Sequence, residues 1–407
     1  MTFFKRTIKD VPIDHKTVLI RADYNVPLNK DGKISDDLRI RASLPTLEYL
    51  LKHHCKVVIM SHLGRPEGRD KSQSLEPIAE RLSELLGKEV IFVDDCIGDK
   101  VTQAVKKAPS NAVILLENLR YYTEEEANDE EFAKKIAKNT GARYFVQDGF
   151  GVVHRAHAST DAITHYIPSV AGLLLEREYV TITSAMEKPK RPLVAVMGGA
   201  KVSDKITVIE RFVDIADRVV IGGAMANTFL KYKGYPVGAS KVEEGQEAVL
   251  DGIYHAAHEK SHGHADDFIM LPADVAVATE ISESAHRKNV TLGHVTNKDL
   301  ILDIGDTAIE NIVEEVRKAK TVIWNGTLGY AELPEFAHGS ARLALELATN
   351  PGITSIIGGG DTADFVLKWD GDGGKSFTHV STGGGASLEL MAGKKLPGVE
   401  SLLDASR

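Results

Sequence analysis

Leu193-Val194-Ala195-Val196-Met197 is an unbroken apolar run, and it is followed by Gly198-Gly199-Ala200-Lys201-Val202-Ser203-Asp204-Lys205. A run of apolar residues without alternation is typical of a strand that is buried on both faces of a parallel sheet. The two glycines allow the backbone to turn sharply and to approach a ligand closely. The apolar positions that begin at Ile206 predict a helix, and we expect Ser203 or Asp204 to cap it.

A strand, a glycine turn and a helix N-terminus in succession are typical of a phosphate site. Free amides and the positive end of the helix dipole favour an anion there. Lys201 and Lys205 are four residues apart, so they would share one face if the helix had begun by Lys201. The alternative interpretation is a glycine turn beside two solvated lysines, since a single motif is only a hypothesis.

The composition is that of a globular protein with more than one domain. The chain has 407 residues, of which 43% are hydrophobic and 26% charged, and one hydrophobic core rarely extends over so many. The formal net charge of −9 at pH 7 argues against nucleic acid or an acidic membrane as the main partner. An anionic substrate must therefore be bound by a local cluster of basic residues.

Cysteine content and hydropathy predict a cytoplasmic protein. Cys55 and Cys96 are the only cysteines, which gives no disulfide framework and suits a reducing compartment. Residues 1–11 contain several charged side chains and lack the apolar core of a signal peptide. We also expect no membrane-spanning segment, because no run of about 18 apolar residues occurs.

In the N-terminal half, short apolar runs alternate with helical patterns, which predicts a doubly wound parallel sheet. Four of the predicted strands end in basic residues, and ligands of open α/β sheets bind at the carboxyl ends of the strands. Arginine binds phosphate or carboxylate through two parallel hydrogen bonds, so we expect a small phosphorylated acid as the ligand. The basic residues at these strand ends are Arg21, His62, Arg65, Arg120, His154, Arg155 and His157.

The C-terminal half repeats the alternation and has four glycine-rich turns between a strand and a helix, at residues 198–199, 222–223, 358–360 and 383–385. Several helix N-termini directed at one crevice favour a polyphosphate. Asp361 lies on the third turn and could bind a hard cation through one carboxylate while phosphates and water complete the coordination. None of the turns has the spacing of a Walker P-loop or of the dinucleotide fingerprint, which argues against a P-loop ATPase and an NAD-dependent dehydrogenase.

Six longer motifs, taken in their order and spacing, resemble the phosphoglycerate kinase family over essentially the whole chain. They are Arg-Ala-Asp-Tyr-Asn-Val-Pro at 21–27, Ser-His-Leu-Gly-Arg-Pro at 61–66, Glu-Asn-Leu-Arg at 117–120, His-Arg-Ala-His at 154–157, Gly-Gly-Ala-Lys-Val-Ser-Asp-Lys at 198–205 and Gly-Gly-Gly-Asp-Thr at 358–362. No single motif identifies the family, but the set does.

The resemblance implies an α/β fold with two Rossmann-like, doubly wound parallel-sheet domains joined by a helix and a hinge. Residues 1–172 would bind 3-phosphoglycerate, residues 173–188 would be the connecting helix, and residues 189–395 would bind the Mg-nucleotide. Residues 396–407 would pack back on the first domain. The implied reaction is the reversible, in-line transfer of a phosphoryl group from 1,3-bisphosphoglycerate to Mg-ADP in glycolysis, with hinge closure, in a monomer.

The resemblance also implies which residues form the site. Arg39, Lys201 and Lys205 would be catalytic, and Asp361 would bind Mg²⁺. The residues that would contact the glycerate substrate are Asp23, Tyr24, Asn25, Arg39, His62, Leu63, Gly64, Arg65, Arg120, His154, Arg155 and His157. The residues that would contact ATP or ADP are Gly199, Lys201, Lys205, Gly222, Gly223, Asn325, Glu332, Gly358, Gly359, Gly360, Asp361, Thr362, Gly383 and Gly384.

Two questions stay open in the sequence. Thr327, Tyr330 and Ala331 depart from the family pattern at positions that line its nucleotide pocket, which leaves the preference between ATP and GTP open. The second question is turnover itself, because a catalytically silent nucleotide-binding scaffold would have the same fold. Loss of Arg39, Lys201 or Asp361 would have favoured the scaffold, and all three are present.

Overall fold

The structure is a computed structural model that describes residues 3–405. The chain divides into two units: unit 1 comprises Met1–Val180 and Lys395–Arg407, and unit 2 comprises Thr181–Lys394. Helix α6 (Leu173–Glu187) is continuous across this division and belongs in part to each unit. Among the described residues, no helix has the length and apolar character that a membrane span requires.

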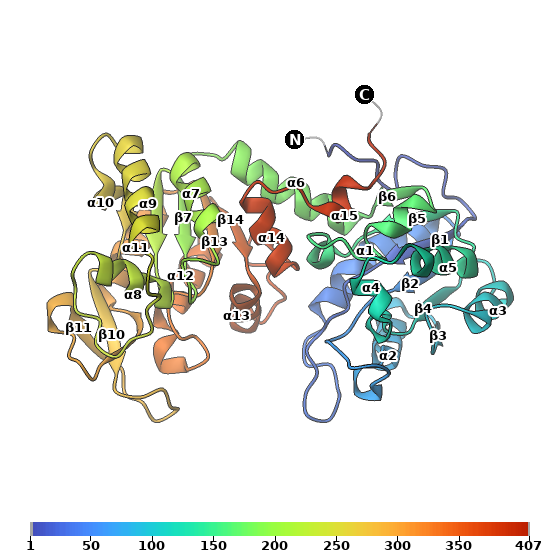
Figure 1. Ribbon diagram of the computed structural model, residues 1–407, viewed down its shortest axis with the longest axis horizontal. Helices are drawn as coiled ribbons and strands as arrows, with labels where there is room; N and C mark the ends of the chain where they lie inside the picture. The colour runs from blue at the N-terminus through green and yellow to red at the C-terminus, as the bar shows by residue number, and fades with distance from the viewer. Residues whose placement is uncertain (1–2, 406–407) are drawn as a thin grey trace. The chain divides into compact units, whose positions relative to one another are not determined.

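Unit 1 contains a six-stranded parallel sheet in the order β3-β4-β2-β1-β5-β6, drawn blue to green in Figure 1. Val18 pairs with Val57 on one side and with Tyr144 on the other. The strands are β1 (Thr17–Arg21), β2 (Lys56–Met60), β3 (Val90–Val93), β4 (Val113–Leu116), β5 (Tyr144–Gln147) and β6 (Ser169–Ala171). The helices between them are α1 (Leu38–Lys52), α2 (Glu76–Leu86), α3 (Asp99–Lys107), α4 (Thr123–Glu126) and α5 (Glu130–Thr140).

The core of unit 1 explains why its strands are apolar without alternation. Val18 and Ile20 of β1 pack in one cluster with Leu47 of α1 and Leu82 of α2. Leu19 lies between them and points to the opposite face of the sheet, where it is equally buried. Both faces of β1 are therefore covered, as in other doubly wound sheets.

The end of the chain lies against its beginning within unit 1. The buried Lys5 donates from Nζ to two backbone carbonyls of the tail, at 2.7 and 2.9 Å, and to the carboxylate of Asp404 at 2.7 Å. The amide of Gly398, in the short helix α15 (Pro397–Glu400), donates to the carbonyl of Val153 at 2.9 Å. The C-terminal residues are thus part of the same packed unit as the N-terminal sheet.

Unit 2 contains a second six-stranded parallel sheet, in the order β15-β14-β13-β7-β8-β9. Its centre is β7, the apolar run at residues 193–197, which is buried along its whole length. The strands are β7 (Leu193–Met197), β8 (Arg218–Ile221), β9 (Ile269–Met270), β13 (Thr321–Asn325), β14 (Thr354–Gly358) and β15 (His379–Val380). The helices are α7 (Ile206–Ile215), α8 (Gly223–Tyr232), α9 (Glu247–Lys260), α10 (Ala265–Phe268), α11 (Asp306–Lys318), α12 (His338–Thr349), α13 (Gly360–Asp370) and α14 (Gly384–Met391).

Three further strands of unit 2 form a separate antiparallel sheet, whereas the sequence predicted parallel sheets only. The order is β11-β10-β12, with β10 (Asp274–Ala278) between β11 (Lys288–Thr291) and β12 (Leu300–Ile304). β10 is buried throughout, so its side chains give no alternation from which an antiparallel neighbour could be read. The two predicted parallel sheets are confirmed, and unit 2 contains this small sheet in addition.

Helix α6 is capped by residues from other elements of unit 1. Thr46 Oγ1, on α1, accepts from the amide of Leu173 at 3.0 Å, and Asp148 Oδ1, after β5, accepts from the amide of Leu174 at 3.0 Å. Thr46 also donates to Asp148 Oδ1 at 2.9 Å. Asp148 is 1% exposed, and burial raises its pKa to about 7. A carboxyl group inside the protein therefore holds the start of the helix that continues into unit 2.

This buried carboxyl predicts a pH dependence of stability. Asp148 stays protonated in the folded chain up to about pH 7, but in the unfolded chain it ionises near 3.8, the usual pKa of an aspartate side chain. The contribution of Asp148 to the free energy of unfolding is therefore full below pH 4. It falls as the pH rises to 7, by at most about 1.4 kcal/mol per pH unit. We expect Asp148→Asn, which keeps the acceptor Oδ1, to remove this decline. Urea unfolding of both proteins at pH 5 and pH 7, followed by circular dichroism, measures it; an identical pH response in both would contradict it.

Candidate active site

The predicted substrate residues follow adjacent strands of unit 1. β4, β2 and β1 are neighbours in the sheet and run in the same direction, so their carboxyl ends meet at one edge. Arg120 follows β4, His62 and Arg65 follow β2, and Asp23 and Asn25 follow β1. The sheet therefore brings together residues that lie far apart in the sequence, as the strand-end pattern predicted.

Hydrogen bonds connect the loops at this edge to one another. Nη1 of Arg39, in the first turn of α1, lies 3.3 Å from Oδ1 of Asp23 and donates to the carbonyl of Asn25 at 2.9 Å. Oδ1 of Asn25 accepts from the amide of Gly64 at 2.8 Å, and the carbonyl of Gly64 accepts from Nη1 of Arg120 at 2.6 Å. A series of hydrogen bonds through Asn25 and Gly64 therefore connects Arg39 to Arg120.

Three arginines at this edge oppose one another's charge. The side chain of Arg120 is 9% exposed, and burial lowers its pKa. Glu126, at 3.2 Å, counters this effect, while the positive charges of Arg155 and Arg65 lower the pKa further. Arg120 and Arg155 are partly buried and Arg65 is exposed, and like charges that are held together interact unfavourably until an anion binds among them. The cluster of Arg65, Arg120 and Arg155 is therefore suited to an anionic ligand.

The histidines at this edge are hydrogen-bonding groups rather than cations. His62 is 3% exposed, and burial lowers its pKa well below the usual value. His157 is also buried, and burial, followed by the charge of Arg21, lowers its pKa to about 4. Nε2 of His154 accepts from Nε of Arg155 at 3.2 Å. His62 and His157 are therefore uncharged at neutral pH.

Three residues at the predicted edge point into the core instead. Tyr24 is fully buried, and its hydroxyl lies 2.9 Å from Oγ of Ser43, so its ring does not reach a ligand at the surface. Leu63 is 4% exposed and packs in the same cluster. Arg21 is 1% exposed, although its place at a strand end grouped it with the anion-binding residues. Burial of a side chain depends on its neighbours in space, which the spacing of residues in the sequence does not show.

Asn118 is a site residue to which the sequence assigned no role. Its Oδ1 accepts from the amides of Leu63 and Arg120, at 3.2 and 3.0 Å, and its Nδ2 donates to the carbonyls of Leu63 and Gln73, at 2.7 and 2.8 Å. The fully buried amide thereby fixes the loop after β2 to the loop after β4. The only sign of this role in the sequence was the position of Asn118 in the Glu-Asn-Leu-Arg motif, and a motif does not show which atoms a side chain contacts.

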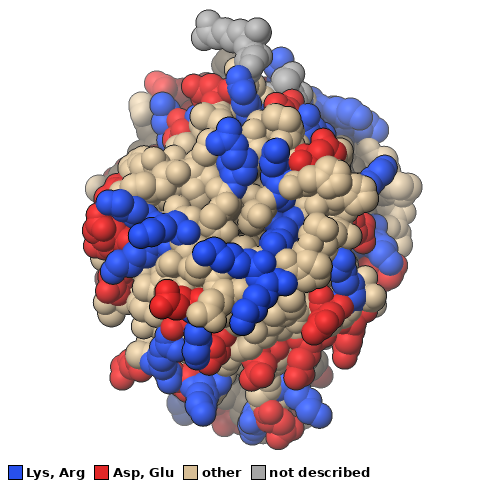
Figure 2. Space-filling view, turned by 90° about the vertical axis from the view of Figure 1, so that its right-hand side faces the viewer, with Lys and Arg blue, Asp and Glu red and all other residues tan. Residues whose placement is uncertain are grey.

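Positive charge alone does not mark this site. Figure 2 shows one side of the molecule, on which lysine and arginine side chains are spread across the middle and acidic side chains gather mostly below them. Many of the cations in the structure are paired, such as Arg41 with Asp37 at 2.8 Å. The predicted substrate site is distinguished instead by arginines that follow the ends of strands in one sheet, of which Arg120 and Arg155 are partly buried and Arg65 is exposed.

The predicted nucleotide residues follow the carboxyl ends of five adjacent strands of unit 2. In sheet order these are β15, β14, β13, β7 and β8, and they are parallel. α14, α13 and α8 begin in the glycine loops after β15, β14 and β8. Three helix N-termini and their free amides therefore meet at one sheet edge, an arrangement that favours a polyphosphate.

The glycines of these loops allow the loops to touch. Gly223 has a φ of 64°, and a Cβ on it would lie 2.6 Å from the amide nitrogen of Gly199 and 2.8 Å from the carbonyl oxygen of Thr327. A Cβ on Gly384 would lie 2.6 Å from the amide nitrogen of Gly360. Any larger residue at either position would push neighbouring loops apart. Gly223 and Gly384, two of the predicted nucleotide contacts, therefore face other loops on the side where a Cβ would lie.

Comparison with known proteins identifies the family. The phosphoglycerate kinase family pattern matches residues 8–394 of this chain. The chain belongs to the phosphoglycerate kinase family. Phosphoglycerate kinase of Dictyoglomus turgidum is 47% identical over 98% of this chain and 99% of its own length, and that of Gloeothece citriformis is 46% identical over 98% and 100%. The structure of phosphoglycerate kinase from Coxiella burnetii, 36% identical, matches over 98% of both chains with a TM-score of 0.83.

Lys201 and Lys205, the two lysines of residues 198–205, lie in different environments. Helix α7 begins at Ile206 as predicted, but its N-cap residue is Lys205, whose side chain makes no capping hydrogen bond. The predicted caps were wrong, because Ser203 binds Glu243 through its amide and hydroxyl instead. Lys201 lies exposed in the loop before the helix, so the two lysines do not share a helical face.

Lys205 connects the glycine turn at residues 198–199 to the end of β13. Its Nζ donates to the carbonyls of Gly198 and Asn325, at 2.8 and 3.2 Å. Burial lowers the pKa of Lys205 to about 8, while the nearby carboxylate of Asp361 acts in the opposite direction. The ammonium of Lys205 therefore lies near the glycine turn at residues 198–199, the end of β13 and the carboxylate of Asp361 in the first turn of α13.

The residues near Asp361 suit a magnesium ion that is bound mainly through phosphates. Among residues 3–405, no three His, Cys, Asp or Glu side chains are arranged to hold a metal ion. Mg²⁺ commonly takes one or two carboxylates and completes its octahedral shell with phosphates and water, so one exposed carboxylate at this edge is enough. Nδ2 of Asn325 is buried and has no hydrogen-bond partner among residues 3–405, and a Cβ on Gly359, two residues before Asp361, would lie 3.3 Å from it.

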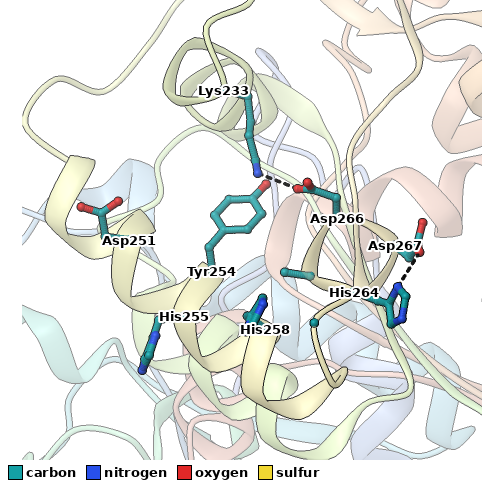
Figure 3. A pocket seen from close by; sticks show the side chains of 10 residues that line it. Lys233, Asp251, Tyr254, His255, His258, His264, Asp266 and Asp267 are labelled. Atoms are coloured by element: carbon teal, nitrogen blue, oxygen red, sulfur yellow. Dashed lines mark hydrogen bonds and ion pairs between the residues drawn. The ribbon is translucent and has the colours of Figure 1, made fainter.

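A separate cavity of unit 2 lies on α9 and α10 (Figure 3), with a volume of about 560 Å³. The ammonium of Lys233 lies 3.9 Å from the ring centre of Tyr254 and 2.5 Å from the carboxylate of Asp266. His258 and His264 also line it, but the described residues provide no three-ligand metal site there. Its lysine is already paired with an acid, so we assign no ligand to this cavity.

Proposed function

We propose that this protein catalyses the reversible transfer of a phosphoryl group from 1,3-bisphosphoglycerate to ADP, giving 3-phosphoglycerate and ATP, as a step of glycolysis. The observation that carries the proposal is the sheet edge of unit 1, where Arg65 and Arg120 follow the neighbouring strands β2 and β4 and where the charges of Arg65 and Arg155 act on Arg120. Membership of the phosphoglycerate kinase family names the substrates that such a cluster would bind.

The substrate would be bound at the edge of unit 1. The arginine cluster would take the phosphate of 3-phosphoglycerate, and Asp23 and Asn25 would take its hydroxyl and carboxylate groups together with His62. Arg39 would bind the phosphoryl group in transit. Adjacent loops would complete the binding site with Gly64, His154 and His157. We assign Tyr24 and Leu63 a packing role only.

The nucleotide would be bound at the edge of unit 2. The N-termini of α8, α13 and α14 would bind the phosphates, with Lys205 between the loops and Lys201 reaching the transferred group. Asp361 would hold Mg²⁺, which neutralises phosphate charge when bound. The other residues that we propose to line the nucleotide site are Gly199, Gly222, Gly223, Asn325, Glu332, Gly358, Gly359, Gly360, Thr362, Gly383 and Gly384.

Transfer would be direct and in line. The transition state spreads negative charge over the equatorial oxygens, so the protein acts by positioning and by charge stabilisation. The attacking carboxylate or phosphate is already ionised at neutral pH, so no general base is required. Because the two sets of residues belong to different units, we propose that closure about α6 brings them together and excludes water. A monomeric state and a cytoplasmic location are parts of the same proposal.

The test is the Mg-ATP-dependent phosphorylation of 3-phosphoglycerate, with hydroxylamine to trap the acyl phosphate. ATP and GTP are compared, since Thr327, Tyr330 and Ala331 bear on the base preference. We expect turnover with wild type and its collapse in Lys201→Ala. A folded protein that binds both ligands and shows no turnover with either nucleotide would leave the silent scaffold as the function.

A further inference from the structure

Arg21 is a buried arginine whose donors are all directed at other residues of unit 1. Its Nε donates to Oγ of Ser159 at 2.7 Å, and its Nη1 donates to the carbonyl of Ala22. Its Nη2 lies 3.1 Å from Nδ1 of His62 and 3.9 Å from Oε1 of Glu125. The side chain is 1% exposed, so it does not reach a substrate at the sheet edge.

The contact between Arg21 and His62 decides where the imidazole carries its proton. A guanidinium has donors only and stays charged in proteins. Nδ1 of His62 must therefore accept, and the neutral ring then carries its hydrogen on Nε2. Among residues 3–405, the only hydrogen-bond partner of the His62 ring is Arg21, so Nε2–H is available to a ligand.

Glu125 is the counter-ion that allows Arg21 to be buried. The carboxylate is fully buried and accepts from both the amide and the hydroxyl of Ser159, the residue that also accepts from Arg21. His157 Nδ1 lies 3.9 Å from Oε1 of Glu125. A buried charge needs both a partner and hydrogen bonds, and Glu125 with Ser159 provides these on the side away from His62.

The groups that surround His62 oppose a second proton on its ring. Besides Arg21, the charged or titratable groups that face it are Arg39 of α1, Arg120 of the turn after β4 and His157 of the loop after β5. Burial is the largest effect and acts in the same direction. The ring is thus held neutral by its environment and held in one tautomer by one hydrogen bond.

We propose that Arg21, with Glu125 as its counter-ion, is a positioning residue that fixes His62 as the neutral Nε2–H tautomer. His62 then offers the 3-phosphoglycerate site a directed hydrogen bond instead of a positive charge. The inference rests on the proposed function only for the identity of the ligand. Its consequence is that the contribution of His62 to substrate binding does not change between about pH 6 and 8, where an ordinary histidine loses its charge.

The first test reads the tautomer in the protein without ligand, so that it stands even if the proposed activity fails. The whole protein, with ¹⁵N in its histidine rings, is examined by long-range ¹H–¹⁵N correlation from pH 5.5 to 8, and His62→Gln assigns the signal. We expect a protonated Nε2 and an unprotonated Nδ1 across the range. A proton on Nδ1, or an imidazolium signal at pH 6, would overturn the proposal. The exposed His255 provides the reference signal.

The second test compares Arg21→Met with Arg21→Lys. Methionine removes the donor, so we expect mixed tautomers of His62 and a KM for 3-phosphoglycerate about tenfold higher, the effect of one hydrogen bond, with kcat within about threefold. Lysine keeps a charged donor and should restore the Nε2–H signal and most of the KM. If Arg21→Met keeps the wild-type tautomer, Arg21 does not position His62. If neither variant folds, the wild-type spectrum still decides the question.

Discussion

Replacing Lys205 with alanine is expected to lower kcat/KM for phosphoryl transfer by about 10³-fold, the upper range for loss of one group that stabilises transition-state charge. The change removes a cation from the nucleotide edge and also the hydrogen bonds from Nζ to the carbonyls of Gly198 and Asn325. The glycine turn at residues 198–199 and the end of β13 would keep the backbone hydrogen bond from Gly198 to Asn325, at 2.9 Å, but would lose the cation between them. Steady-state kinetics with varied Mg-ATP measure the effect.

The control for Lys205 is Lys231→Ala. Lys231, in the last turn of α8, forms an exposed pair with Glu244 at 2.6 Å, and such pairs contribute little. Its loss should leave kcat/KM within about twofold of wild type. Equal losses in the two alanine variants would contradict the role of Lys205.

Lys205 also predicts a dependence on pH. Since its pKa is about 8, kcat/KM for the nucleotide should fall as the pH rises above 8.

Replacing Arg39 with alanine is expected to lower kcat/KM by about 10²- to 10³-fold, with most of the loss in kcat. Arg39 is 30% exposed and is held towards the sheet edge by Asp23 and by the carbonyl of Asn25. Its guanidinium can bind two oxygens of a phosphoryl group at once, which a lysine cannot, so Arg39→Lys should recover only part of the loss.

Arg41→Ala is the matched control on the same helix. Arg41 lies two residues further along α1 and is half exposed, and its partner is Asp37 at 2.8 Å. We expect the variant to keep kcat/KM within about twofold of wild type. A loss in Arg39→Ala no greater than that in Arg41→Ala would mean that Arg39 takes no part in transfer.

Those parts of the fold that depend on local pattern could be predicted from the sequence. The run at residues 193–197 became the central strand β7, because a strand covered on both faces must be apolar throughout. The start of α7 at Ile206 was also predicted. The antiparallel partner of β12 was missed, since an apolar run shows that a strand is buried but not which way its neighbour runs.

Helix caps from distant segments could not be predicted. Asp306 and Thr307 begin α11, but the helix is capped from β10: the carboxylate of Asp274 accepts from the amides of Thr307 and Ala308, at 3.1 and 2.7 Å. Asp148 does the same for α6. A cap that comes from another strand leaves no mark in the sequence around the helix it serves, because only the folded sheet brings the two together.

The site could be predicted as far as strand ends determine it. Arg65 and Arg120 were placed at one edge because parallel strands end together. The burial of Arg21 and Tyr24 behind that edge could not be predicted, since loops of similar composition direct some side chains outwards and others inwards. The difference matters chemically, because a buried arginine can orient a histidine but cannot bind a substrate.

Direct transfer between ATP and 3-phosphoglycerate can be observed in a single turnover with enzyme in excess over [γ-³²P]ATP. The reaction is stopped within milliseconds, and label is measured in the hydroxylamine-trapped acyl phosphate and on the protein. We predict that label passes to the acyl phosphate only when 3-phosphoglycerate is present and never accumulates on the chain. Label on the protein, or ATP loss without labelled acyl phosphate, would contradict it.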